Sequence, residues 1–103
     1  MSASVIFNAL GDPVRLELVR RLSQERHQRV TSITSGLGLT RQGARRHLQV
    51  LVEANIVKLE PVGRDVWVEL DPKSLDAAKE FMRSLEVEWD RRLDALKRSL
   101  ENE

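Results

Sequence analysis

The chain contains no cysteine, which excludes a disulfide framework, a thiolate metal site and a cysteine nucleophile. It has only two histidines, His27 in a polar stretch and His47 in a helical pattern, and two isolated imidazoles cannot build a site for zinc or a softer metal. We therefore expect no metal site and no metal sensing, and no residue pattern indicates another cofactor.

Long apolar runs are absent as well. No segment approaches the roughly 18 consecutive apolar residues that a membrane-spanning helix needs, and the first ten residues lack a signal-peptide pattern. Together with the missing cysteines, this favours a cytoplasmic protein with no membrane contact. At 103 residues the chain has the length of one small domain, residues 1–103, which would bury about 65% of its unfolded surface.

The small net charge of +1 hides a division along the chain. Residues 1–64 contain ten lysines or arginines against five acidic residues, a net charge of +5, whereas residues 65–103 contain seven against eleven, a net charge of −4. Such segregation would turn one basic face toward a polyanion such as DNA. Ordinary charge scatter over two helices is the competing interpretation.

Residues 30–53 are the most informative segment, because they combine two helical patterns with a turn at Leu37-Gly38-Leu39. In the second pattern, the residues that recur at the spacing of one helix face, and so predict its buried side, are Ala44, His47, Leu48, Leu51 and Val52. The opposite side is rich in arginine and glutamine. This arrangement is typical of a helix-turn-helix, whose second helix enters a DNA groove.

Thr40 precedes this second helix and is a favoured N-cap residue, so it predicts where the helix begins. The residues expected on the exposed side are Arg41, Gln42, Arg45, Arg46 and Gln49. Arginine and glutamine match the hydrogen-bonding edges of guanine and adenine, and arginine also binds phosphate. A charged helix face is often merely solvated, so this pattern alone leaves DNA binding open.

Residues 56–70 predict a β-hairpin directly after this helix. Two runs rich in β-branched residues, 56–60 and 65–70, flank the connection Pro61-Val62-Gly63-Arg64. A hairpin in this place is the wing of a winged helix. Arg64 at its tip and Lys58 on its first strand would lie over the sugar-phosphate backbone. The helix before it is expected to end at Asn55, because asparagine is a favoured left-handed C-cap.

The N-terminal segment predicts scaffolding helices. Apolar residues between positions 5 and 10 favour a short amphipathic helix that ends at Gly11. Asp12 and Pro13 then form an N-cap and first-turn pair for a second helix that ends near Ser23. The polar residues 24–29 are expected to form a loop.

Residues 73–101 contain neither glycine nor proline and predict one helix of about 28 residues and ~42 Å. Its apolar stripe consists of Leu75, Ala78, Met82, Leu85, Trp89, Leu93, Leu96 and Leu100. The first turns would pack on the domain, but the rest is too long for so small a core and favours a partner helix in a coiled-coil-like seam. The simplest partner is the same helix of a second copy. Such a homodimer would place two recognition helices about one DNA turn (~34 Å) apart on a palindromic operator.

In their order and spacing these motifs resemble the ArsR-type winged helix-turn-helix transcriptional regulators. The similarity lies in residues 7–15, 37–51, 53–57, 63–64 and 70–72 and in the closing helix around Trp89, so it covers nearly the whole chain. The closing helix is similar to that of a branch without the familiar metal sites. Cysteines that many members have near residues 30–34 are absent here, and so is the aspartate and histidine set that other members have on the last helix.

The resemblance implies a mainly α fold with a small β-hairpin, about five helices, and a dimer formed by the first and last helices. The interface residues would be Val5, Ile6, Leu85, Trp89, Leu93 and Leu96. It also implies a homodimeric, double-stranded-DNA-binding transcriptional regulator, usually a repressor. The recognition roles would fall to Thr40, Arg41, Gln42, Arg45 and Arg46, with Arg64 in the wing. His47 matches a histidine common in the family and is expected to be structural, with a phosphate contact as the alternative.

The main alternative is a winged-helix dimer that acts as a protein–protein interaction module, with its basic face against an acidic partner. No serine, cysteine or lysine constellation accompanies the acidic residues of the last helix, so we do not expect an enzyme. The sequence identifies no effector. Either a small molecule or a partner protein could release the regulator from DNA.

Overall fold

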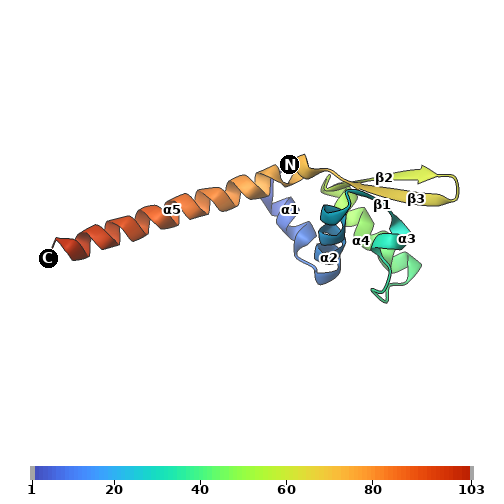
Figure 1. The fold of residues 1–103 in the computed structure, drawn as a ribbon, viewed down its shortest axis with the longest axis horizontal. Coiled ribbons are helices and arrows are strands. Elements are labelled where there is room, and N and C mark those ends of the chain that lie inside the picture. The colour runs from blue at the N-terminus through green and yellow to red at the C-terminus, as the bar shows by residue number, and fades with distance from the viewer. Residues whose placement is uncertain (1, 103) are drawn as a thin grey trace.

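The computed structural model describes residues 2–102, which form a small helical body with a projecting hairpin and one long helix (Figure 1). The elements are α1 (Ala3–Leu10), α2 (Pro13–Gln24), β1 (His27–Arg29), α3 (Val30–Ile33), α4 (Arg41–Glu53), β2 (Val57–Val62), β3 (Asp65–Leu70), the 3-10 helix η1 (Pro72–Leu75) and α5 (Asp76–Glu101). This order confirms the expected winged helix-turn-helix: α3 and α4 are its two helices, and β2 and β3 form its wing.

The first two helices meet at a corner that Asp12 determines. Its Oδ1 accepts hydrogen bonds from the backbone N–H of Val14 at 2.8 Å and of Arg15 at 3.1 Å, and Pro13 occupies the first turn. The predicted N-cap is therefore confirmed. These N–H groups, Arg15 first, hold the pKa of Asp12 below its usual range because they stabilise the ionised carboxylate.

The core lies where α1 to α4 meet the inner face of the sheet. Its largest fully buried side chains are Ile6, Leu18, Leu22, Ile33, Leu51, Ile56, Val57 and Val68. Ile6 corrects one expectation. It was predicted at the dimer interface, but its side chain has no exposed surface in the protomer and so cannot contact a second copy. The neighbouring Val5 is 40% exposed.

The sheet has three antiparallel strands in the order β1-β3-β2, one more than predicted. Residues 27–29 were expected in a loop, but His27 pairs with Glu69, Gln28 with Val68 and Arg29 with Trp67. A three-residue strand has too short a pattern to be recognised alone, and it forms here because β3 offers an unpaired edge. On one sheet face the His27 and Trp67 rings lie 4.7 Å apart between centroids.

The wing turn is tighter than the predicted four-residue connection. Val62 pairs with Asp65, so only Gly63 and Arg64 form the turn. Gly63 has a φ of +62°, the left-handed region that two-residue hairpin turns require and that glycine adopts without strain. Arg64 therefore lies at the tip of the wing, as expected.

The C-terminal helix begins later than expected and leaves the body of the protein. Residues 72–75 form η1, capped by Asp71, whose Oδ1 accepts from the N–H of Lys73 at 3.1 Å, and α5 follows from Asp76. Ala78 is buried, but from residue 79 to 102 every side chain except that of the half-buried Glu88 is exposed. With this helix extended from the body, the protomer is 70 Å long (Figure 1). Nothing among the helices of residues 2–102 is long and apolar enough to cross a membrane.

Candidate nucleic-acid interface

The recognition helix α4 has defined ends. At its start, the Oγ1 of Thr40 accepts a hydrogen bond from the N–H of Gly43 at 2.9 Å, which confirms Thr40 as the N-cap. At its end, Asn55 has a φ of +58°, and the N–H of Ile56 donates to the carbonyl of Leu51 at 3.0 Å. This confirms the left-handed turn predicted at Asn55. Thr40 and Asn55 therefore mark the two ends of α4.

The two faces of α4 follow the predicted division. Leu48 and Leu51 are buried in the core, and Ala44, His47 and Val52 are half-buried. The exposed residues of the helix are Arg41, Gln42, Arg45, Arg46, Gln49 and Glu53. Glu53 was not predicted on this face; its Oε1 accepts a hydrogen bond from the Nε2 of Gln49 at 3.3 Å. One acidic group therefore borders an otherwise basic and amide surface.

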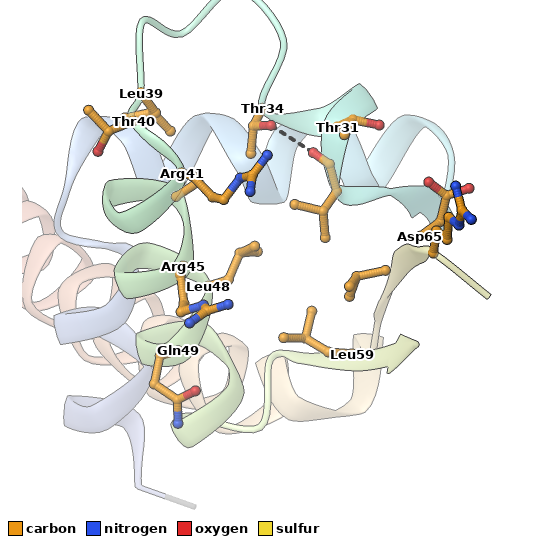
Figure 2. Close-up of a pocket in the computed structure, with 14 residues that line it drawn as sticks. Thr31, Thr34, Leu39, Thr40, Arg41, Arg45, Leu48, Gln49, Leu59 and Asp65 are labelled. Atoms are coloured by element: carbon orange, nitrogen blue, oxygen red, sulfur yellow. Dashed lines mark hydrogen bonds between the residues drawn. The ribbon is translucent and has the colours of Figure 1, made fainter. Parts of the chain in front are cut away.

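A groove of about 590 Å³ separates α4 from the wing (Figure 2). Thr40, Arg41, Arg45 and Gln49 line it from the side of α4, and Arg64 lines it from the turn of the wing. In Figure 2 Arg41 and Arg45 point from α4 toward α3 and the hairpin. Five of the seven predicted DNA-contacting residues therefore meet in one concave, basic surface.

The other two predicted contacts lie around the helix from this groove. Gln42 and Arg46 line a second, shallower depression on the outer side of α4, which they share with Arg45 and Gln49. The basic surface thus wraps around the exposed half of α4 and is not confined to the groove beside the wing. Such a convex, polar helix face fits the major groove of B-DNA, which is wide enough to admit an α-helix.

The wing wall of the groove is largely apolar, which sequence analysis missed. Leu59 of β2 and Val66 of β3 face the groove and are 39% and 41% exposed. Lys58 was predicted over the DNA backbone, but it neighbours Leu59 in the strand and therefore faces the opposite side of the sheet. Asp65 also lines the groove, and its Oδ2 lies 3.7 Å from the Nε of Arg29.

The upper wall of the groove is α3, whose position depends on Arg21 of α2. The Nη1 of Arg21 donates to the carbonyls of Ile33 at 2.9 Å and Ser35 at 2.7 Å, and its Nε donates to Glu17 at 3.0 Å. Hydrogen bonds from Arg20 and then Arg21 lower the pKa of Glu17 to about 2. Arg21 thus binds the carbonyl of Ile33, the last residue of α3, and the carbonyl of Ser35 in the turn that follows, at a helix end where backbone carbonyls lack helical partners.

Replacing Arg21 by leucine should destabilise the helix-turn-helix. The carbonyls of Ile33 and Ser35 would lose their donor, at a cost of about 1–3 kcal/mol, which lowers the melting temperature of a domain of this size by about 10 °C. Arg20→Leu is the matched control: among residues 2–102 the side chain of Arg20 hydrogen-bonds only to Glu17, at the surface, so its loss should cost less than about 1 kcal/mol. Thermal unfolding followed by circular dichroism checks this, and equal losses in the two variants would contradict it.

The chemistry of this surface fits a polyanion with hydrogen-bonding edges. Its arginines carry positive charge, its glutamines offer paired donors and acceptors, and Thr40 and Arg41 at the N-terminus of α4 line the groove. Within residues 2–102 no three histidine, cysteine, aspartate or glutamate side chains come together as they would around a metal ion. The geometry therefore favours nucleic-acid binding.

Comparison with known proteins points the same way. A family model described as a helix-turn-helix domain matches residues 10–60. An ArsR-like transcriptional regulator from Rhodococcus sp. RHA1 is 29% identical, and the match covers 93% of this chain and 90% of that one with a TM-score of 0.73. A transcriptional regulator homologue from Pyrococcus horikoshii OT3 is 30% identical over 81% of this chain and 86% of that one, with a TM-score of 0.62.

A third solved structure, of a possible transcriptional regulator for arsenical resistance, is 28% identical; the match covers 86% of this chain and 92% of that one with a TM-score of 0.71. No curated protein sequence matches the chain.

The helix-turn-helix, its wing and the basic groove between them define a winged-helix, DNA-binding transcriptional regulator. In sequence and in fold the chain is similar to ArsR-like regulators over most of its length.

Proposed function

We propose that this protein is a homodimeric repressor that binds a palindromic operator in double-stranded DNA and does not respond to metal ions. The observation that carries the proposal is the groove between α4 and the wing, which Arg41 and Arg45 line from α4 and Arg64 lines from the turn of the wing. Arg64 can contact the phosphate backbone beside the wing while α4 enters the adjacent major groove.

The proposed contacts divide into two kinds. Arg41, Gln42, Arg45 and Gln49 lie where α4 can reach base edges, and these residue types form bidentate pairs with guanine or adenine. Three residues are placed to bind phosphates: Thr40 at the first turn of α4, Arg46 on its outer side and Arg64 in the wing. Phosphate contacts orient the protein on the duplex but read no sequence. The position of Arg64 on the hairpin and of the others on α4 supports the division between wing and helix; the division within α4 is part of the proposal.

The proposed dimer interface is the apolar stripe of α5 beyond the body. Its large side chains are strongly exposed in the protomer, including Leu85, Trp89, Leu93 and Leu96, at 45–62%. Solvent exposure of a continuous apolar stripe is unfavourable, and a second copy of the same helix would cover it. Val5 on α1 lies exposed in the helix that packs beside the start of α5, where the Phe7 and Phe81 rings are 5.8 Å apart.

Insensitivity to metal ions is proposed from the donor set. One of the similar proteins is named for arsenical resistance, yet this chain has no cysteine for arsenite, and its two histidines lie on different elements. We expect zinc or arsenite at concentrations up to about 100-fold over protein to leave operator affinity unchanged. Fluorescence anisotropy of a labelled duplex measures this, and metal-dependent release would contradict it.

The salt dependence of duplex binding tests the proposal itself. A dimer that neutralises about six to ten phosphates should lose about 10³-fold or more in affinity between about 50 and 200 mM salt. It should also retain a preference for duplexes from its own upstream region over bulk DNA. If no duplex binds better than bulk DNA while an acidic polypeptide such as polyglutamate does bind, the protein-interaction alternative is supported and the repressor proposal fails.

A further inference from the structure

The side chain of Arg15 connects three helices. Its Nε donates to the carbonyl of Ala9 at 2.6 Å, and its Nη2 donates to the carbonyl of Asn8 at 3.5 Å, so it binds the C-terminal end of α1. Its Nη1 lies 3.2 Å from the Nδ1 of His47 on α4. Arg15 itself belongs to the first turn of α2 and is half-buried. One guanidinium therefore joins the recognition helix to the end of α1.

The direction of the bond between Arg15 and His47 follows from chemistry. A guanidinium has donors only, so the Nδ1 of His47 must accept, and the proton of the neutral ring is on Nε2. The only other charged group near this nitrogen among the described residues is Asp12, whose Oδ1 lies 3.8 Å away and already accepts two backbone bonds. The end of α1 contributes neutral carbonyls. His47 thus lies between a cation and a carboxylate.

We propose that Arg15 and His47 form a positioning pair that sets the orientation of α4 relative to α1 for operator binding. This rests on the proposed function and deepens it. α1 packs beside α5, and α5 carries the proposed dimer interface. The pair therefore also sets the position of each recognition helix relative to the two-fold axis. A two-fold operator requires two recognition helices at a fixed spacing, so a small rotation of α4 would weaken both half-sites together.

The effect of protonating His47 on operator affinity distinguishes this positioning role from a direct contact between His47 and phosphate. A protonated ring can no longer accept from Arg15, and it places a second cation beside the guanidinium, so the pair should break. Operator affinity should then fall when acidification adds a proton to the ring of His47. A histidine that contacts phosphate predicts the reverse, because the added charge strengthens binding to DNA.

The experiment compares the operator affinities of wild type, His47→Leu and His47→Asn at several pH values, on an operator obtained by selection from random duplex DNA. Thermal unfolding is measured on each protein. Asparagine keeps an acceptor at the place of Nδ1, whereas leucine removes it. We expect His47→Leu to lose about tenfold in affinity at pH 8 and His47→Asn to lose much less. Neither variant should show the part of the pH dependence of operator affinity that His47 causes in the wild type. Any pH dependence that His27 contributes should remain in both variants.

The outcomes are distinguishable. If wild type binds the operator but His47→Leu binds equally well after correction for folded fraction, the positioning role is wrong and the proposed function stands. If affinity rises on acidification of the wild type and not of His47→Asn, His47 contacts phosphate. If the wild type binds no duplex above bulk DNA, both proposals fail. Arg15→Lys gives an independent check, because a lysine keeps the charge but cannot bind Ala9, Asn8 and His47 at once; it should resemble His47→Leu.

Discussion

Replacing Leu93 by glutamate should convert a dimer into a monomer. Leu93 lies well along the exposed part of α5, in the apolar stripe that includes Leu85, Trp89 and Leu96. In a two-fold interface each substitution occurs twice, and each removes about 1.5–3 kcal/mol of leucine burial before the cost of burying a carboxylate is added. A loss of about 4 kcal/mol or more corresponds to about a thousandfold weaker association.

Val87→Glu is the matched control for this prediction. Val87 is 62% exposed on the same helix and two residues from both Leu85 and Trp89, which places it about 160° around the axis from them. The Val87→Glu substitution introduces the same negative charge but leaves the apolar stripe intact. Sedimentation equilibrium should find a dimer for wild type and Val87→Glu and a monomer for Leu93→Glu. A Leu93→Glu protein that still sediments as a dimer would remove α5 from the interface.

Changing Arg41 and Arg64 should produce two different losses of DNA binding. Arg41 lies in the first turn of α4, within reach of a base edge, so Arg41→Ala should cost about 1–3 kcal/mol per half-site and relax discrimination at one position of that half-site. Arg64 lies in the wing turn, so Arg64→Ala should weaken all duplexes alike and reduce the salt slope by about 2 per dimer.

Competition binding against single-base variants of the operator measures both effects. The informative quantity is the ratio of affinities between the preferred and altered base, because it cancels any uniform loss. For Arg41→Ala that ratio should fall at one position of the half-site and stay constant elsewhere. An altered base preference in Arg64→Ala would show that the wing reads sequence and that its assignment to phosphate is wrong.

The features that could be predicted from the sequence are those with a local cause. Asp12, Thr40 and Asn55 mark helix ends through bonds to backbone groups within a few residues, so their residue types are informative without any tertiary structure. The exposed face of α4 follows from helical spacing alone. The candidate DNA-binding residues could therefore be named, with their sides of the helix, before the fold was known.

The features that sequence analysis missed depend on partners far along the chain. Strand β1 exists because Gln28 meets Val68, forty residues later, and nothing in the polar segment 24–29 announces that pairing. Arg15 and Arg21 look like surface arginines of α2, yet they bind the end of α1, His47 and the end of α3. Ile6 belongs to an amphipathic helix with apolar residues on two sides, and only packing shows which side is the core.

Selection of bound sequences from random duplex DNA tests directly whether this protein binds a two-fold symmetric DNA sequence as a dimer. We expect enrichment of an inverted repeat whose half-sites are centred about one helical turn, ~34 Å, apart, and the occurrence of that repeat upstream of the protein's own gene. No enrichment over the starting pool, or enrichment of a single unrepeated site, would contradict it.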